Sequence, residues 1–269
     1  MRLRGKVTVI TGGASGIGEA SSSLFASEGS KVIIADIQEE KGEHLAHLII
    51  SRGGVATVVR CDVSDEEQVR SLINQTVSEH GKIDILFNNA GTILPKPLED
   101  VAEAEWDRIF RINVKSMYLT MREASPYLKK SKGCIINMAS MNGLSGQRHN
   151  AAYSATKGAV IALTKASAID YAPYGVRVNA ICPAGVMTPL MEQWFAQQNN
   201  PELFRKEHDL SHMLGRTATP EEIARVALFL ASEDASFITG TAFPVDGGAT
   251  LGYGSGVKPE WNYMKLPHD

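Results

Sequence analysis

Short runs of apolar, mostly β-branched residues recur along this chain and alternate with longer segments in which apolar residues recur every three to four positions. A short apolar run bounded by turn residues is typical of a buried strand, and the longer period is typical of an amphipathic helix. The runs predict seven strands, at residues 7–10, 31–35, 56–60, 83–87, 134–138, 176–182 and 242–245. The longer segments predict helices at residues 39–52, 65–79, 105–130 and 151–171.

The alternation of strands and helices determines the expected fold class. A helix between two strands lets the second strand run parallel to the first, with the helix packed on the sheet. We therefore expect an α/β fold, a doubly wound sheet of about seven parallel strands with helices on both faces, in a single domain over residues 1–269. An insertion at residues 187–219 and a glycine-dotted tail at residues 247–269 interrupt the pattern, and there we expect substrate specificity to reside.

Composition supports one large domain and limits the classes of partner. The chain has 269 residues, of which 43% are hydrophobic, enough for an extensive core. Its formal net charge is −3, so no basic field attracts nucleic acid or an anionic membrane surface. No apolar stretch approaches the length of a membrane span. We therefore expect a small-molecule substrate, and neither nucleic acid nor membrane as a partner.

The cysteines and the N-terminal segment indicate the compartment. Cys61, Cys134 and Cys182 are far apart and lie in or beside predicted strands, which is typical of reduced cysteines in a core. The apolar stretch at residues 7–10 ends at once in glycines and is too short for a signal peptide. We therefore expect a cytoplasmic protein.

A glycine-rich turn follows the first predicted strand and opens a helix. Its backbone carries no side chain at Gly12, Gly16 and Gly18. Backbone N–H groups there and at Ser15 and Ile17 can approach a pyrophosphate at the helix N-terminus. A plain strand-to-helix turn is the alternative, and the strand–helix–strand context favours dinucleotide binding.

Acidic residues end the second predicted strand and follow the third. Asp36 stands where a carboxylate can accept both ribose hydroxyls of the adenosine half of a dinucleotide. A 2′-phosphate there would meet like charge, and no arginine or lysine in the glycine turn or at Ile37 would neutralise it. We therefore expect NAD rather than NADP; a solvated strand-end carboxylate is the alternative. Asp62 and Val63 are placed to flank the adenine.

Ser140, Tyr153 and Lys157 carry the catalytic chemistry that we expect. Tyr153 and Lys157 stand one helical turn apart, so the ammonium can stabilise the phenolate and lower the pKa of the tyrosine from about 10. Such a phenol can exchange a proton with a substrate hydroxyl, and Ser140 can hydrogen-bond the same oxygen. Lys157 can also bind the nicotinamide ribose hydroxyls. An exposed i, i+4 pair on a helix surface is the alternative for the tyrosine and lysine.

Together these motifs resemble those of the short-chain dehydrogenase/reductase family over about residues 6–248. The shared marks are the turn at residues 11–18, Asp62-Val63, Asn88-Asn89-Ala90-Gly91, Asn113, Ser140, Tyr153-Ser154-Ala155-Thr156-Lys157 and Pro183-Ala184-Gly185 with Thr188. The resemblance implies a Rossmann-like fold, hydride transfer on the pro-S face of the nicotinamide, and a homotetramer.

The resemblance also implies roles for residues beyond the catalytic trio. Further cofactor-binding residues would be Asn89, Ala90, Gly91, Pro183, Gly185, Val186 and Thr188. The first three would close the fourth strand beneath the cofactor, and the others would cover the nicotinamide carboxamide. Asn113 would bend the long helix and order a water that leads from Lys157 to solvent. Ordinary turns, and a structural asparagine, are the alternatives.

Polar residues crowd the segment between Ser140 and Tyr153 and predict a polar pocket mouth. We expect substrate contacts from Asn142, Arg148, His149 and Asn150. A steroid or acyl chain would leave such groups unpaired, so a small polar substrate is favoured. An inward Arg148 would favour a carboxylate, whereas a solvated loop is the alternative.

The insertion and the tail carry apolar side chains that need a partner. The insertion holds Leu190, Met191, Trp194, Phe195, Phe204, His208, His212 and Met213. This pattern resembles the substrate lid of the family, and packing in a core or an interface is the alternative. His208 and His212 could seat a metal, but no acidic pattern supports one and we expect none. Trp261 and Tyr263 in the tail would pack against a neighbouring subunit and shape its pocket.

The sequence therefore favours an NAD-dependent dehydrogenase that oxidises a secondary hydroxyl of a sugar, polyol or sugar acid. A carbonyl or 3-oxoacyl reductase is the alternative within enzymes, and Asp36 and the polar mouth disfavour it. A regulatory protein that senses NAD without turnover is the alternative from another class. Such proteins usually lose the tyrosine or the lysine, and both are present here.

Overall fold

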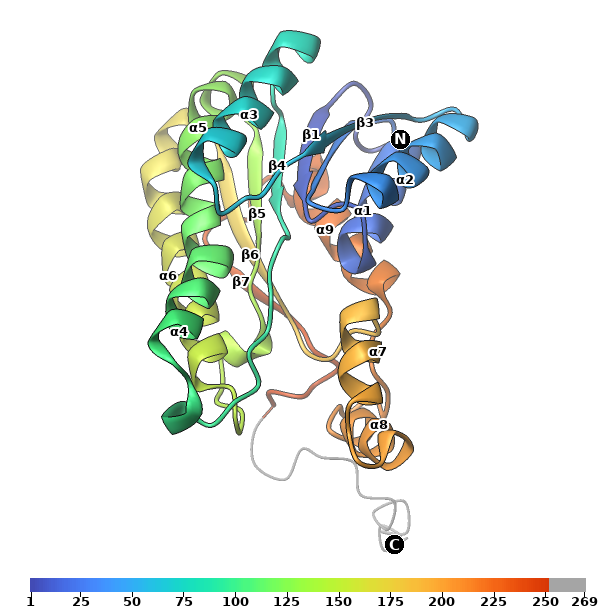
Figure 1. Cartoon of the computed structure of the whole chain (residues 1–269). Coiled ribbons are helices and arrows are strands. Elements are labelled where there is room, and N and C mark those ends of the chain that lie inside the picture. The colour runs from blue at the N-terminus through green and yellow to red at the C-terminus, as the bar shows by residue number, and fades with distance from the viewer. Residues whose placement is uncertain (252–269) are drawn as a thin grey trace, which may run out of the picture.

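A computed structural model describes residues 1–251, and they contain one seven-stranded parallel sheet (Figure 1). The strands are β1 (Val7–Thr11), β2 (Lys31–Asp36), β3 (Val55–Arg60), β4 (Ile85–Asn88), β5 (Cys134–Met138), β6 (Arg177–Pro183) and β7 (Ala242–Val245). Their order is β3-β2-β1-β4-β5-β6-β7, and every neighbouring pair is parallel. The predicted fold class is confirmed, with each expected strand within two residues of its expected bounds.

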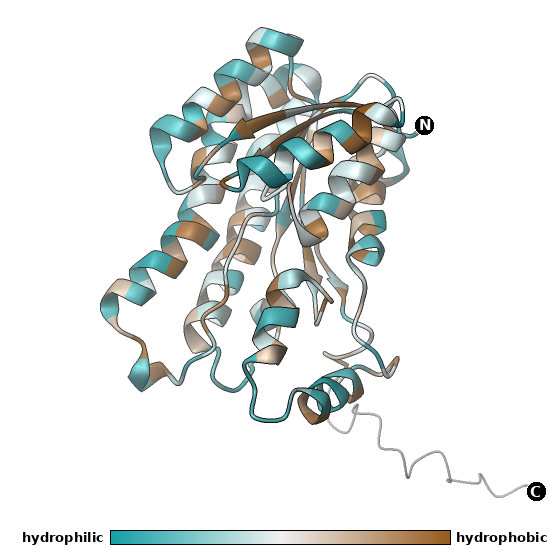
Figure 2. Ribbon diagram, turned by 45° about the vertical axis from the view of Figure 1, so that its right-hand side comes forward, coloured by the Kyte–Doolittle hydropathy of each residue, from teal (hydrophilic) through white to brown (hydrophobic). Residues whose placement is uncertain are grey.

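Two sets of helices cover the sheet. Helices α1 (Gly16–Ser27), α2 (Glu39–Ser51) and α9 (Pro220–Ala231) lie on one face, and α3 (Glu66–His80), α5 (Ser116–Ser131) and α6 (Ala151–Tyr171) on the other (Figure 1). Short 3₁₀ turns connect elements at Leu98–Asp100, Met141–Gly143, Ala172–Tyr174 and Glu233–Ala235. Figure 2 shows apolar strands between helices whose outer sides are hydrophilic.

The core has two layers because side chains alternate across the strands. Along β1, Ile10 packs with the α1 and α9 side, and its neighbour Val9 packs with the α3 and α5 side. Ile34 and Ile33 divide in the same way along β2. Side chains alternate between two buried faces, so nearly every strand position is apolar. Short, wholly apolar runs were therefore sufficient to locate these strands.

The order of strands reverses between β1 and β4, and this point places the site. Thr11 at the end of β1 pairs with Asn88 at the end of β4, so both strands end at the same level. The helix after β1 covers one face and the helices after β4 cover the other. In open parallel sheets such a reversal leaves a crevice at the carboxyl ends of the strands, where ligands bind.

The predicted helix at residues 105–130 contains an irregular turn. It consists of α4 (Glu103–Phe110), a π-helical turn (Arg111–Lys115) and α5. A π turn carries one residue more per hydrogen-bonded turn than an α-helix, and such turns are frequent at functional sites. Asn113 lies in the middle of it and is fully buried.

The insertion forms two short helices beyond the carboxyl ends of the strands (Figure 1). The side chains of Thr188 and Asn200 cap α7 (Pro189–Ala196) and α8 (Pro201–Leu210) by accepting hydrogen bonds from backbone N–H groups. Phe195 and Phe204 pack edge to face across the two helices, with ring centroids 6.0 Å apart. The two helices therefore form one packed unit.

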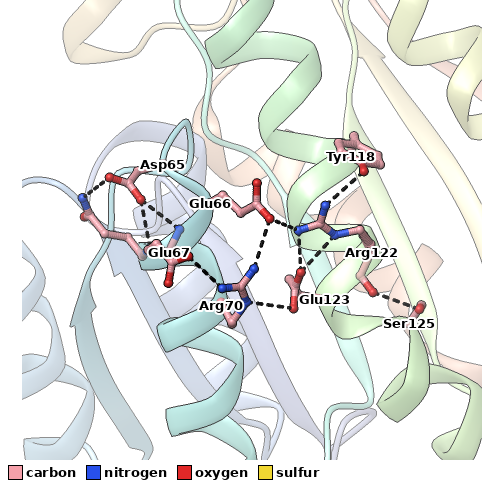
Figure 3. Close-up of polar contacts among 9 residues, drawn as sticks. Asp65, Glu66, Glu67, Arg70, Tyr118, Arg122, Glu123 and Ser125 are labelled. Atoms are coloured by element: carbon pink, nitrogen blue, oxygen red, sulfur yellow. Dashed lines mark hydrogen bonds and ion pairs between the residues drawn. The ribbon is translucent and has the colours of Figure 1, made fainter.

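A polar network joins α3 to α5 on the outer side of the sheet (Figure 3). Arg70 contacts Glu66 at 3.1 Å, and Arg122 contacts Glu66 and Glu123 at 2.7 Å each. The hydrogen bond from Arg122 is the main cause that lowers the pKa of Glu66. Because most of these side chains are largely exposed, each pair contributes little to stability.

The three cysteines are buried and unpaired, as predicted. Within residues 1–251, no helix is both long and apolar enough to cross a membrane. The tail from residue 252 onward, with Trp261 and Tyr263, lies outside the described residues, so its expected contact with a neighbouring subunit stays a prediction.

Candidate active site

A cavity of about 590 Å³ opens at the carboxyl ends of the strands. This volume lies within the range of small-molecule sites. The predicted site residues that line it are Gly12, Ser15, Gly16, Ile17, Asp36, Asp62, Val63, Asn89, Ala90, Gly91, Ser140, Tyr153, Lys157, Pro183, Val186 and Thr188. The fold therefore brings the glycine turn and the catalytic trio to a single cavity.

The glycine turn has a backbone that other residues would not adopt. Gly12 and Gly16 have φ of +61° and +55°, in the left-handed region. A Cβ on Gly18 would lie 1.9 Å from the carbonyl oxygen of Gly12. Helix α1 begins at Gly16, so its free N–H groups face the cavity. Gly18 itself lies outside the cavity wall and acts by permitting the turn.

Thr11 at the end of β1 and Asn89 after the neighbouring strand β4 brace this turn. The Thr11 hydroxyl accepts hydrogen bonds from the backbone N–H groups of Asn89 and Ala90, at 3.0 and 3.1 Å. The Asn89 amide in turn donates to the carbonyls of Thr11 and Gly12, at 3.1 and 3.0 Å. The side chain of Asn89 is thereby engaged with the protein, and it supports the cradle as well as lining the cavity.

Asp36 ends β2 and faces the glycine turn. Its carboxylate accepts hydrogen bonds from the backbone N–H of Ala14 at 3.0 Å and of Gln38 at 2.9 Å. Each carboxylate oxygen retains a lone pair, because an ionised carboxylate offers about four acceptor positions. The carboxylate is thus fixed in orientation, with acceptor capacity left toward the cavity that it lines.

The catalytic trio meets at the end of β5 and the start of α6. The Lys157 ammonium donates a hydrogen bond to the carbonyl of Met138 at 2.7 Å, and it lies 5.6 Å from the ring centroid of Tyr153. Ser140 is almost fully buried, and its hydroxyl accepts from the backbone N–H of Asn142 at 3.2 Å. All three side chains therefore face the same part of the cavity.

The expectation of a lowered tyrosine pKa was wrong for the unliganded protein. Burial raises the pKa of Tyr153 above its usual value, and the neighbouring Ser140 hydroxyl offsets this only in part. Burial also lowers the pKa of Lys157 to about 8. The helical spacing correctly predicted that the ammonium lies close to the phenol. It could not predict that burial removes solvent from both groups, which disfavours the phenolate of Tyr153 and the ammonium of Lys157 alike.

The buried ammonium makes stability depend on pH, and this dependence is testable. The pKa of Lys157 is about 8 in the folded protein and 10.5 in the unfolded chain, so folding opposes its charge below pH 8. As pH rises from 8 to 10.5 this cost disappears, and the unliganded protein gains about 3 kcal/mol from this residue. Denaturant unfolding of unaltered protein and Lys157→Met, compared at pH 7 and 10.5, measures the gain as a difference.

Lys165 provides the matched control for this measurement. It lies on the same helix as Lys157 but is exposed, so Lys165→Met should show no such pH-dependent difference from the unaltered protein. If the free energies of unfolding of unaltered protein and Lys157→Met differed by the same amount at both pH values, a lysine that is charged while buried would be contradicted.

Asn113 connects the π-helical turn to the cavity wall. Its side chain accepts from the backbone N–H of Thr92 at 2.8 Å and donates to the Thr92 carbonyl at 2.9 Å and to Thr156 at 3.2 Å. It does not itself line the cavity, whereas Thr92 does. A π-helical turn is present at this residue, and its predicted roles in bending the helix and ordering a water stay predictions.

The segment after β6 forms the wall opposite the glycine turn. Thr188 lies against Gly16, since a Cβ on that glycine would approach the threonine Cγ2 to 3.1 Å. Gly185 does not line the cavity, and its N–H and carbonyl are bound by His212 and Ala218, at 3.1 and 3.0 Å. Pro183, Val186 and Thr188 therefore line the cavity with Gly185 behind them, and their contact with the nicotinamide stays a prediction.

The four predicted substrate residues lie outside the cavity wall, and their contact with a substrate stays a prediction. Among the described residues, the cavity wall includes none of Asn142, Arg148, His149 and Asn150. Asn142 is buried and donates to Gln147 at 2.7 Å, Asn150 donates to the same oxygen at 3.1 Å, and Arg148 and His149 are exposed. Both amide nitrogens donate to Gln147, whereas the Asn142 Oδ1 is buried without a hydrogen-bond partner, and the loop supplies none of its polar groups to the cavity wall.

Other residues line the cavity that the sequence reasoning did not find. They are chiefly Thr92, Ile93, Arg108, Arg111, Ile112 and Met138. Arg108 and Arg111 stand one helical turn apart beside Asn113, and that spacing is a signal a reading of helix faces could have used. Leu190 and Met191 belong to the predicted lid, and they bring α7 to the cavity.

No metal site accompanies this cavity in the described part of the chain. No group of three or more potential metal-ligating side chains is found there, and the Nδ1 of His208 and both ring nitrogens of His212 are bound to protein groups. The chemistry available to the cavity is therefore proton exchange at Tyr153, hydrogen bonding at Ser140, and cation and backbone contacts from Lys157 and the glycine turn.

Comparison with known proteins places the chain among related sequences. Residues 12–250 match a family model described as "Enoyl-(Acyl carrier protein) reductase". The chain is 41% identical to meso-2,3-butanediol dehydrogenase of Serratia marcescens over 94% of its own length and 98% of the relative's. It is 42% identical to L-fucose dehydrogenase of Oryctolagus cuniculus over 94% and 88%. The crystal structure of levodione reductase superimposes with a TM-score of 0.90 at 34% identity, covering 94% of this chain and 100% of that one.

Proposed function

From its membership of the short-chain dehydrogenase/reductase family, whose enzymes act on hydroxyl groups of small molecules, we propose a specific reaction for this chain. It oxidises a secondary hydroxyl of a small polar substrate with NAD. One observation carries the proposal. Ser140, Tyr153 and Lys157 line the same cavity as the glycine turn and Asp36. A proton-exchanging phenol thus lies beside a dinucleotide cradle.

The residues of the cavity fit a nicotinamide dinucleotide. A Cβ on Gly12 would lie 2.9 Å from the Cα of Ala90, so the cradle is open only because this position is glycine. The N-terminus of α1 supplies N–H groups for a pyrophosphate, and Asp36 supplies acceptors for a ribose. When bound, the nicotinamide supplies the hydride acceptor that the protein itself lacks.

The proton chemistry belongs to the chain's own residues. In the oxidising direction, the Tyr153 oxygen takes the hydroxyl proton from the substrate, and Ser140 holds the substrate oxygen near it. Lys157 places a positive charge close to the phenol and binds ribose hydroxyls. Because burial raises the pKa of Tyr153 without ligand, the oxidation depends on this charge and on the bound cofactor to favour the phenolate.

Preference for NAD rests on Asp36, and its replacement tests it. In Asp36→Asn, the like charge that a 2′-phosphate would meet is gone, while one backbone hydrogen bond can be kept. We expect the ratio of kcat/KM for NAD to that for NADP to fall at least about tenfold. Steady-state rates with both cofactors measure it. Asp65→Asn, at the exposed N-terminal cap of α3, is the matched control and should leave the ratio unchanged.

Two features support a small substrate. Relatives of this chain carry the names meso-2,3-butanediol, cyclopentanol and L-fucose dehydrogenase. Beside the catalytic trio, the cavity wall combines apolar Leu190 and Met191 with the cationic Arg108 and Arg111. A sugar, polyol or sugar acid offers hydroxyl and carboxylate groups to such a wall, together with a carbon skeleton.

Reduction of the 3-oxo group or the double bond of an acyl thioester is the second candidate. The description of the matching family model, an enoyl-acyl carrier protein reductase, favours it. Asp36 and the modest cavity volume favour the first candidate. Oxidation of NADH or NADPH with crotonyl and acetoacetyl thioesters separates the two.

We also propose a homotetramer in the cytoplasm. Large apolar side chains are exposed on one protomer, including Ile169 on α6 and Phe237, which is fully exposed before β7. Exposed apolar groups of this kind are typical of interfaces. Three buried, unpaired cysteines support a reducing compartment. Light scattering after size exclusion measures the assembly, and a monomeric mass would contradict the tetramer.

A further inference from the structure

His212 lies behind the wall of the cavity and is bound through both ring nitrogens. It follows α8 and is only 2% exposed. Its Nε2 lies 3.1 Å from the backbone nitrogen of Gly185, and its Nδ1 lies 2.9 Å from the carbonyl oxygen of His208. It therefore links the helical insertion to the backbone after β6 by a side-chain hydrogen bond to Gly185.

The two contacts define the protonation of the ring. A carbonyl oxygen only accepts, so Nδ1 carries the hydrogen and donates to His208. Gly185 N–H only donates, so Nε2 is bare and accepts from it. The imidazole is thus neutral, in the tautomer with hydrogen on Nδ1.

The Gly185 peptide is enclosed on its other side as well. Its carbonyl accepts from Ala218 N–H at 3.0 Å, and Met187 N–H donates to the Ala218 carbonyl at 2.8 Å. A Cβ on Gly185 would lie 2.0 Å from the Cε1 of His208, so α8 packs directly on the glycine. The position of this peptide therefore depends on the insertion, and the N–H is held by His212.

The cavity wall continues from this peptide on both sides. Pro183 and Ala184 before Gly185, and Val186 and Thr188 after it, line the cavity. This wall faces the glycine turn, because Thr188 lies against Gly16. A shift of the Gly185 peptide would move residues on both sides of it, and with them the surface that a dinucleotide contacts.

We infer that His212 is a positioning residue for dinucleotide binding, which fixes the Gly185 peptide and thereby the cavity wall at residues 183–188. This inference rests on the proposed function, since it assigns the wall to the cofactor. His212 touches neither cavity nor reacting atoms, and it acts through Gly185. His208 packs against Gly185 but hydrogen-bonds elsewhere, because its Nδ1 contacts Thr217 at 3.1 Å.

Two amide variants test the inference because they differ only in reach. A glutamine at position 212 can place its oxygen where Nε2 lies, whereas an asparagine oxygen reaches only the position of Nδ1. We expect His212→Asn to raise the Kd for NADH about tenfold, the loss of one hydrogen bond, and His212→Gln to stay within about twofold of the unaltered protein. His44→Asn, on the exposed side of α2, is the control and should leave the Kd unchanged.

A second readout needs neither cofactor nor activity. Backbone amide exchange of unliganded protein should show the Gly185 N–H protected in unaltered protein and in His212→Gln, and faster exchange in His212→Asn. Equal NADH affinity in the two amide variants, or a Gly185 amide that exchanges freely in the unaltered protein, would overturn the inference. If unaltered protein bound no dinucleotide at all, the proposed function would fail instead, and the exchange data would still report on the contact.

Discussion

Replacing Tyr153 by phenylalanine is expected to lower kcat for alcohol oxidation by about 10²- to 10⁴-fold, the usual contribution of a positioned general acid or base. The substitution removes only the phenolic oxygen and keeps the ring in its partly buried place on α6. The glycine turn, Asp36 and Lys157 are untouched, so the Kd for NADH should change less than about threefold. Initial rates with saturating cofactor, and NADH fluorescence titration, measure the two quantities.

Tyr171 supplies the control for this substitution. It stands at the far end of the same helix, and burial raises its pKa as well, yet it is remote from the cavity wall. Tyr171→Phe should therefore keep full activity. If Tyr153→Phe retained more than a tenth of the turnover, the proton would have another acceptor, and the assigned role would be wrong. If it retained the protein's biological role without turnover, the sensing alternative would replace the enzymatic one.

Replacing Gly18 by alanine is the second large expected effect. The added Cβ would lie 1.9 Å from the carbonyl oxygen of Gly12 and 2.8 Å from the amide nitrogen of Asn89. The carbonyl belongs to the turn, and the amide nitrogen is hydrogen-bonded to it, so neither can yield without disturbing the turn. We expect unfolding free energy to fall by at least about 2 kcal/mol and the Kd for NADH to rise at least about a hundredfold. Denaturant unfolding and fluorescence titration measure these changes.

Gly158 offers a matched glycine in α6 with open space around it. An added Cβ would have no heavy atom within 4 Å, so Gly158→Ala should be neutral or stabilise the protein by up to about 1 kcal/mol, as expected for a helix interior. It should also leave NADH affinity unchanged, although it follows Lys157 directly in the sequence. An unchanged Kd in Gly18→Ala would contradict the assignment of the turn to the dinucleotide.

The sequence was a good guide wherever the signal was local. Apolar runs located the strands because a parallel sheet buried on both faces leaves nearly every strand position apolar. The glycine at position 18 and the carboxylate at position 36 could be placed because a strand–turn–helix unit determines its own geometry. The cavity lining agrees with these predictions, with Gly18 acting from behind the wall.

Features that depend on tertiary packing were not accessible in this way. The spacing of Tyr153 and Lys157 predicted their proximity, but the pKa of the tyrosine follows from burial that no local pattern records. The polar loop before Tyr153 was expected to face the substrate, and its amides pair with each other instead. The place of Arg108 in the cavity wall, and the contact of His212 with Gly185 behind it, follow only when segments distant in sequence meet.

The measurement that tests the central claim most directly is the initial rate of NADH formation by purified protein across sugars, polyols, sugar acids and plain secondary alcohols, with NADP in parallel. The account expects turnover of one polar class, faster with NAD than with NADP, and its loss in Tyr153→Phe. Tight NADH binding with no turnover across the panel, or turnover that survives in Tyr153→Phe, would contradict it.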